Sequence, residues 1–264
     1  MIEKIIDIVI HAGKEVLKIY TSSESFEIFM KQDNSPLTIA DKVSNRILLD
    51  GIQSISTIPI ISEENKKIFK SRKEWNKFWL VDPLDGTKEF IKRNGEFTIN
   101  IALIENGKPI LGVVYAPVKD LLYFAFANEA YKKKNNSISK LELGKETRQV
   151  NKIRAVVSRS HLNESTLRFL SHLKMKTGKN IEKVSVGSSL KICYIAEGKA
   201  DIYPRFVPTM EWDTAAAHAI LSFSGGKLVT VDKNLDNFFK NSELRYNKET
   251  LKNPPFVAFN PYVF

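Results

Sequence analysis

The spacing of apolar residues changes along the chain from helical to strand-like, and then to an alternation of the two, which restricts the fold to a few layered architectures. Residues 2–20 and 38–55 carry apolar side chains at the spacing of amphipathic helices. Shorter apolar runs typical of strands follow at residues 59–62, 78–81, 97–104, 110–116 and 121–127. Asn106-Gly107 between two of these runs predicts a hairpin turn. We therefore expect helices packed on a largely antiparallel sheet.

The second half of the chain alternates strand-like and helical segments. Strands are expected at residues 153–157, 184–186, 201–203 and 228–231, and helices at residues 163–173, 188–197 and 214–223. Such an alternation is typical of a layered α/β arrangement. We predict an N-terminal α+β domain at residues 1–150 and a C-terminal α/β domain at residues 151–264.

The net charge of +10 leaves three interpretations open. It fits a nucleic-acid-binding protein, an enzyme for a small anionic substrate, or a well-solvated surface. Basic residues are spread along the sequence instead of forming a tail, which argues against a stable nucleic-acid partner. Lys132, Lys133 and Lys134 precede two asparagines and are expected in a solvated turn.

The sequence shows no sign of a membrane span or a secretory signal. No apolar run approaches the roughly 20 residues of a transmembrane helix, and Glu3, Lys4 and Asp7 interrupt the apolar N-terminal segment. We expect a cytoplasmic protein; peripheral attachment to the cytoplasmic face of the inner membrane is an open alternative for so basic a chain. The single cysteine, Cys193, excludes an intramolecular disulfide and a cysteine-based metal site.

The segment Asp82-Pro83-Leu84-Asp85-Gly86-Thr87 carries the strongest chemical signal. An apolar strand is expected to end at Asp82, and Asp85 follows at the expected start of a helix. Two carboxylates this close repel unless a cation lies between them, and Mg²⁺ prefers such oxygen ligands. The backbone N–H groups of a helix N-terminus at Gly86 and Thr87 suit a phosphate. Metal-assisted phosphoryl chemistry is the prediction, and an ordinary turn with an aspartate cap is the alternative.

Two further acidic segments weigh against the ordinary turn. Glu63-Glu64 follows the strand expected at residues 59–62, and Glu211-Trp212-Asp213 precedes an alanine-rich helix. Each segment alone has a simple explanation, a solvated acidic pair for the first and a helix N-cap at Asp213 for the second. Three acidic turns at the ends of elements favour a shared site.

With these three segments in this order, the sequence resembles the inositol monophosphatase superfamily over essentially its whole length. The resemblance implies a layered α/β/α/β/α sandwich with the active site between its two halves, in agreement with the expected elements. It can be narrowed to the bacterial 3'(2'),5'-bisphosphate nucleotidases. The motifs that narrow it begin at Asn34, Asp85, Ser158, Gly187 and Tyr203.

The resemblance also implies roles for particular residues. It implies that two or three Mg²⁺ ions are bound by Glu63, Asp82, Asp85, Asp213 and the backbone carbonyl of Leu84. It implies Asp41, Thr87 and Glu63 as catalytic residues that orient and activate a water for in-line attack on phosphorus. The implied substrate-binding residues are Glu63, Leu84, Asp85, Gly86, Thr87, His161, Ser188, Lys191, Arg205 and Asp213.

The implied activity is that of a phosphoric monoester hydrolase. It would remove the 3'-phosphate of 3'-phosphoadenosine 5'-phosphate to give AMP and phosphate, and 3'-phosphoadenosine 5'-phosphosulfate is a further candidate substrate. Sensitivity to lithium and a link to sulfur metabolism follow from the same resemblance, which leaves monomer and homodimer open. The alternatives are an inositol-1-phosphate phosphatase, more distantly a fructose-1,6-bisphosphatase, and, from another class, a basic nucleic-acid-binding protein.

Overall fold

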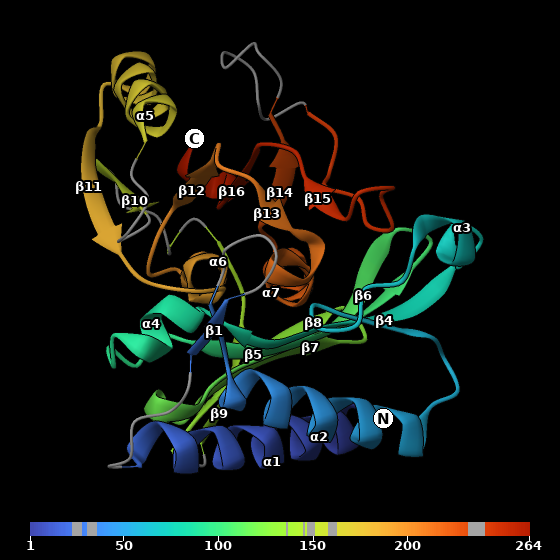
Figure 1. The fold of residues 1–264 in the computed structure, drawn as a ribbon. Coiled ribbons are helices and arrows are strands. Elements are labelled where there is room, and N and C mark those ends of the chain that lie inside the picture. Colours follow the sequence, from blue (N-terminus) through green and yellow to red (C-terminus); the bar gives the residue numbers. More distant parts are fainter. Residues whose placement is uncertain are drawn as a thin grey trace.

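The chain folds into alternating layers of helix and sheet, which confirms the layered α/β/α/β/α architecture (Figure 1). The computed structural model describes residues 1–22, 28–30, 36–135, 137–144, 146, 151–157, 163–231 and 241–264. From bottom to top in Figure 1, the layers are helices α1 and α2, a large sheet, helices α6 and α7, a smaller sheet, and helix α5. These helices run over Ile2–Thr21 (α1), Ile39–Ile55 (α2), Glu164–Thr177 (α5), Leu190–Ala196 (α6) and Glu211–Phe223 (α7).

Within the described residues, the large sheet has the strand order β3-β4-β5-β6-β7-β8-β9. Its strands are β3 (Ile60–Ser62), β4 (Lys77–Asp85), β5 (Thr98–Glu105), β6 (Lys108–Ala116), β7 (Leu121–Phe126), β8 (Glu129–Lys134) and β9 (Ser137–Leu141). Strand β3 runs parallel to β4, and all other neighbours are antiparallel. The expected largely antiparallel sheet is therefore confirmed.

The expectation of a solvated turn at Lys132–Lys134 is wrong. These residues form the end of β8, where they pair with β7 on one side and β9 on the other. Lys132 also forms an ion pair with Glu197, the residue that follows α6. Pairing on both sides and a half-buried acidic partner outweigh the local polarity of the lysine run.

The smaller sheet has the strand order β11-β10-β12-β16-β14 in the described part of the chain. Its strands are β10 (Lys152–Val157), β11 (Asn180–Ser185), β12 (Ile202–Arg205), β14 (Lys227–Thr230) and β16 (Phe256–Phe259). Strand β10 is parallel to β11 and β12, whereas β16 is antiparallel to β12 and β14. The buried strand β16 was not expected, because its four residues follow two prolines and form too short a run to stand out.

Apolar faces hold the layers together. Helices α1 and α2 cover one face of the large sheet with buried residues such as Ile5 and Leu48, and α5 covers the outer face of the smaller sheet with residues such as Phe169. Helices α6 and α7 lie in the cluster between the two sheets. Gly112 of β6 lets α7 approach closely, because a Cβ there would lie 2.2 Å from the backbone oxygen of Ala216. The seam around α6 and α7 joins the two halves.

Short elements complete the described chain. They are β1 (Ile28–Met30), β2 (Pro36–Thr38), α3 (Phe69–Arg72), α4 (Thr87–Ile91), β13 (Thr209–Met210), β15 (Lys252–Asn253) and the 3₁₀ helices η1 (Pro117–Lys119) and η4 (Pro261–Val263). Across the described ranges, no helix combines the length and apolar character that crossing a bilayer requires.

Candidate active site

A β-bulge in β4 turns Asp82 and Asp85 to the same face of the large sheet. In a regular strand, side chains three positions apart point to opposite faces. Here Asp82 pairs with Asn100 of β5 and Asp85 pairs with Thr98, so that three steps along β4 lie opposite two steps along β5. The expectation that the strand ends at Asp82 is therefore wrong, although the two carboxylates do share one face.

Hydrogen bonds fix the bulge on both sides. The Ser44 hydroxyl of α2 donates to the carbonyl of Pro83 at 2.7 Å, and the N–H of Leu84 donates to Asp82 Oδ1 at 3.1 Å. The carbonyl of Leu84, a predicted metal ligand, accepts from Thr87 Oγ1 at 3.4 Å. The backbone between the two aspartates is thus held against α2 and α4.

Asp41 and Thr87, the predicted catalytic pair, are in direct contact. Asp41 is buried near the start of α2, where its Oδ2 accepts from the N–H and the hydroxyl of Thr38, both at 2.7 Å. Asp41 Oδ1 accepts from Thr87 Oγ1 at 3.3 Å. Thr87 begins α4 after Gly86, whose φ of 94° is a left-handed conformation that favours glycine.

Four carboxylates act on one another at this place. Asp82 is 1% exposed, and burial, followed by the charges of Glu63, Asp85 and Asp213, raises its pKa well above the ordinary range. The pKa of Asp213 is raised in the same way by burial, then by Asp85 and Glu63. Burial raises the pKa of Asp85 to about 6, against the opposing effect of Lys191. These groups, which are far apart in sequence, therefore share one electrostatic environment.

The four carboxylates do not form a closed cage. Among the residues that the structure describes, no three His, Cys, Asp or Glu side chains are grouped so that they could hold a metal ion as they stand. Like charges repel most strongly where burial lowers the effective dielectric constant. The charges of the predicted ligands thus influence one another, although the side chains are not close enough together to hold a metal ion as they stand.

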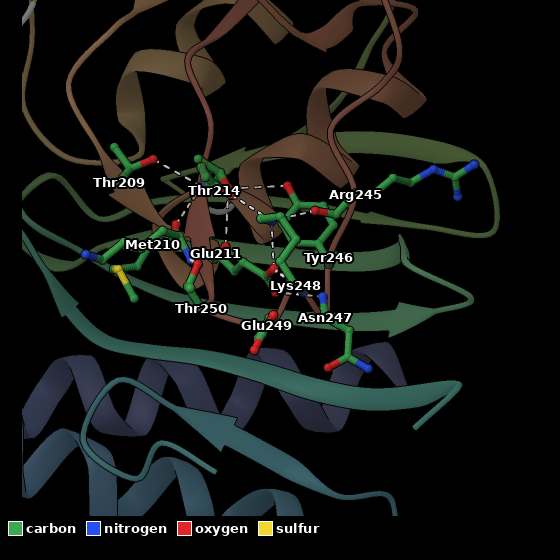
Figure 2. A network of polar contacts seen from close by, with 12 residues as sticks. Thr209, Met210, Glu211, Thr214, Arg245, Tyr246, Asn247, Lys248, Glu249 and Thr250 are labelled. Atoms are coloured by element: carbon green, nitrogen blue, oxygen red, sulfur yellow. Dashed lines mark hydrogen bonds and ion pairs between the residues drawn. The ribbon is translucent and has the colours of Figure 1, made fainter. Parts of the chain in front are cut away.

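A buried network around Glu211 holds the start of α7 (Figure 2). One interpretation of the sequence made Asp213 the N-cap of this helix. That interpretation is wrong, because α7 begins at Glu211. Instead Asp213 Oδ2 accepts from the N–H of the N-cap residue Met210 at 2.8 Å. Glu211 is fully buried and accepts from the N–H groups of Asn247 and Lys248, each at 2.8 Å, and it forms an ion pair with Lys248 Nζ at 2.6 Å.

The loop that precedes α6 is tied to strand β5. The N–H of Gly187 donates to Glu96 Oε2 at 2.9 Å. Ser189 Oγ donates to Asn100 Oδ1 at 2.9 Å and lies 2.8 Å from Thr98 Oγ1. Since Asn100 and Thr98 are the pairing partners of the two β4 aspartates, this polar bridge places the loop next to them.

A cavity of about 120 Å³ lies where these elements meet. The predicted residues in its wall are Asp85, Gly86, Ser188, Lys191, Arg205 and Asp213. Ser188 Oγ is buried and has no hydrogen-bond partner among the described residues. Burial lowers the pKa of Lys191, while Asp85 counteracts this shift. His161, another predicted contact, lies outside the described residues.

Other residues of the cavity wall were not selected from the sequence. They include Glu89, Tyr203 and Thr209. The Tyr203 ring lies below the Lys191 ammonium, 5.9 Å from ring centre to nitrogen. Tyr203 is two positions before Arg205 on one strand and therefore on the same face, which was a usable signal. Glu89 could also have been selected from the sequence, because it lies in the first turn of the helix predicted after Asp85.

Oxygen ligands on a sheet face, a helix start with free N–H groups and cationic side chains around one cavity define a class of site. Such a site suits a phosphorylated small molecule together with a divalent cation. The chain belongs to the inositol monophosphatase family, whose model matches residues 1–256.

Several relatives in this family carry more specific names. The chain is 44% identical over 226 residues to the 3'(2'),5'-bisphosphate nucleotidase CysQ of Salmonella typhimurium, covering 85% of this chain and 88% of the relative. It is 48% identical over 232 residues to the CysQ nucleotidase of Buchnera aphidicola, covering 87% and 84%. The crystal structure of CysQ from Bacteroides thetaiotaomicron superimposes with a TM-score of 0.84 at 44% identity, covering 98% of this chain and 96% of the other.

Proposed function

We propose that this chain is a Mg²⁺-dependent phosphomonoesterase that removes the 3'-phosphate of 3'-phosphoadenosine 5'-phosphate to give AMP and phosphate. The observation that carries the proposal is one cavity lined by Asp85 and Asp213 as well as by Lys191 and Arg205. The acidic pair suits a metal-bound reacting phosphate, and the basic pair suits a second phosphate on the same substrate. The names of the relatives at 44% and 48% identity support the same substrate class.

The donor set fits magnesium. The residues that would hold two or three ions are Glu63, Asp82, Asp85, Asp213 and, through its carbonyl, Leu84. All of these donors are oxygens, the ligands that Mg²⁺ prefers. Asp82 is buried among carboxylates of the same sign and has no cationic partner within the described residues. When bound, Mg²⁺ offsets charge on the phosphate and makes water more acidic.

The proton of the attacking water has a path through Thr87 to Asp41. The Thr87 hydroxyl donates to Asp41, which leaves its lone pairs to accept from a water. Asp41 then takes the hydroxyl proton as general base, while Thr38 holds the carboxylate in place through two hydrogen bonds. We assign Glu63 to the orientation of the same water, and the N–H groups of Gly86 and Thr87 to the phosphate oxygens.

The nucleotide lies, in this proposal, against the loop before α6 and the end of β12. Lys191 and Arg205 bind the 5'-phosphate, and the unpaired hydroxyl of Ser188 supplies a further hydrogen bond. His161 completes the contacts. The tie between this loop and β5 keeps the nucleotide end at a fixed distance from the carboxylates.

Family membership supports several finer proposals. We propose inhibition by lithium, a role in sulfur metabolism, a cytoplasmic location and activity on the sulfated analogue, 3'-phosphoadenosine 5'-phosphosulfate. We also propose that the division near residue 150 separates two domains, the first with most of the metal ligands and the second with the nucleotide contacts.

The release of phosphate from competing substrates tests the proposal. We expect kcat/KM for 3'-phosphoadenosine 5'-phosphate to exceed that for inositol 1-phosphate by about tenfold or more, and both rates to require Mg²⁺. Asp82→Asn should abolish turnover. A preference for inositol 1-phosphate would contradict the nucleotidase assignment. Salt-sensitive binding to nucleic acid polymers that Asp82→Asn leaves unchanged, without any turnover, would favour the non-catalytic alternative.

A further inference from the structure

Glu89 is an acidic group of the cavity for which the proposed mechanism has no use. It lies in the first turn of α4 and is half-buried. A Cβ added at Gly86 would lie 3.3 Å from Glu89 Oε2, and one added at Gly187 would lie 3.0 Å from Glu89 Cγ. The carboxylate therefore stands between the expected phosphate contact and the loop that carries the expected nucleotide contacts.

The charge of Glu89 acts on Lys191, but the carboxylate makes no direct polar contact among the described residues. Within the described ranges, it accepts no hydrogen bond and forms no ion pair. The Ser188 hydroxyl, in the same cavity wall, also lacks a partner in the described part of the chain, and Ser188 is only 6% exposed. Because the Ser188 hydroxyl is buried, its missing partner indicates that a ligand enters this cavity, and the Glu89 carboxylate lines the same wall. An ionised carboxylate can only accept, so its ligand partner must be a donor.

A phosphate bound beside Glu89 would be repelled by the carboxylate, and a hydrogen-bond donor on the ligand must offset this repulsion. The nearest donor on the proposed substrate is the hydroxyl on the carbon adjacent to the phosphorylated one, since phosphate oxygens only accept. We propose that Glu89 accepts a hydrogen bond from the ribose 2'-hydroxyl of a 3'-phosphonucleotide and thereby selects ribonucleotides over 2'-deoxyribonucleotides. This inference rests on the proposed function and adds a specificity residue to it.

The expected selectivity is large because the acceptor is charged. Hydrogen bonds to charged groups contribute about 1.5–3 kcal/mol, which corresponds to a roughly 10- to 100-fold ratio of kcat/KM between the two nucleotides. Losing the carboxylate also removes repulsion toward the phosphate. Turnover of the 2'-deoxy analogue should therefore stay constant or rise in the same variant that loses turnover of the ribonucleotide.

The experiment compares 3'-phosphoadenosine 5'-phosphate with its 2'-deoxy analogue in four proteins. Wild type should prefer the ribonucleotide about 10- to 100-fold, Glu89→Met should show a ratio near one, and Glu89→Gln, which keeps a neutral acceptor, should fall between them. Glu164→Met is the matched control, because it removes an exposed carboxylate from the first turn of α5, away from the cavity. It should keep the wild-type ratio. Thermal unfolding confirms that each variant is folded.

The possible results distinguish a failure of this inference from a failure of the proposed function. An equal rate on both nucleotides in wild type, or a full preference retained in Glu89→Met, would overturn it. If Glu89 binds a cation instead, Glu89→Met raises the Mg²⁺ concentration for half-maximal rate and slows both nucleotides equally, which also overturns it. Absence of any ribonucleotide turnover by wild type would contradict the proposed function itself.

Discussion

Truncation of Glu211 is expected to destabilise the protein far more than the loss of an ordinary glutamate. Its carboxylate is fully buried and accepts two backbone N–H groups and the Lys248 ammonium at 2.6 to 2.8 Å. Its charge also acts on Arg72, a guanidinium that is only 1% exposed. Glu211→Ala leaves these donors buried without their acceptor.

The magnitude follows from removing one partner of a buried ionic network. Such changes cost about 3–5 kcal/mol, and each kcal/mol lowers the melting temperature of a chain of this size by roughly 2–4 °C. We therefore expect Glu211→Ala to lower it by roughly 6–20 °C. Glu211→Gln keeps one acceptor and should lie between wild type and Glu211→Ala. Mg²⁺ affinity should fall too, because the network positions Asp213.

Thermal unfolding followed by circular dichroism at pH 7 measures the effect. Glu243→Ala is the control, because Glu243 lies in the same region of the chain but forms an exposed pair with Lys108 at 3.9 Å. Exposed pairs contribute about 0–1 kcal/mol, so this variant should melt within about 4 °C of wild type. A Glu211→Ala melting temperature as close to wild type as that of the control would refute the reasoning.

Three further predictions address pH, metal removal and the loop before α6. Burial, followed by Lys108 and Lys248, lowers the pKa of His218 to about 3 from 6.5. Between these two values only the unfolded chain binds the proton. The free energy of unfolding therefore falls by about 1.4 kcal/mol for each pH unit from pH 6.5 down to about pH 3. Between pH 6.5 and pH 5, the loss of unfolding free energy measured with urea should be about 1.5–2 kcal/mol smaller in His218→Gln than in wild type. Equal losses in the two proteins would contradict this prediction. Asp82→Asn removes a buried charge among like charges and should raise the melting temperature measured in EDTA; a lower value would show that Asp82 is stabilised by a protein partner. In Gly187→Ala the new Cβ would lie 2.8 Å from the carbonyl oxygen of Glu96, so the loop must shift. We expect kcat/KM for the nucleotide to drop about 10- to 100-fold. An unchanged KM would show that the loop does not contact the nucleotide.

Much of the fold could be predicted from apolar spacing, whereas strand pairing could not. Helices α1 and α2 and strands β4 to β7 of the large sheet follow directly from local patterns, whereas β8 and β9 do not. Strand β16 was not predicted, because its place between β12 and β14 depends on partners distant in sequence. Lys132–Lys134 were misassigned for the same reason, since pairing with β7 and β9 outweighs their polarity.

The site was predictable in its residue types but not in its geometry. The sequence indicated that Asp82 and Asp85 converge, yet it suggested a turn where the structure has a bulge. A bulge is a property of two paired strands, so β4 alone could not show it. The polar bridge from Ser189 to β5 likewise joins residues 89 positions apart. Glu89 lay beside a recognised motif, but only the cavity distinguishes it from a surface glutamate.

Binding of Mn²⁺, a paramagnetic substitute for Mg²⁺, tests most directly whether the two halves of the chain share one metal centre. Electron paramagnetic resonance of free Mn²⁺ gives the affinity of wild type, of Asp82→Asn in β4 and of Asp213→Asn in α7. We expect each substitution alone to weaken binding by about tenfold or more, since both carboxylates would contact the same ions. Wild-type affinity in either variant would place that carboxylate outside the centre and contradict a metal site assembled across the seam.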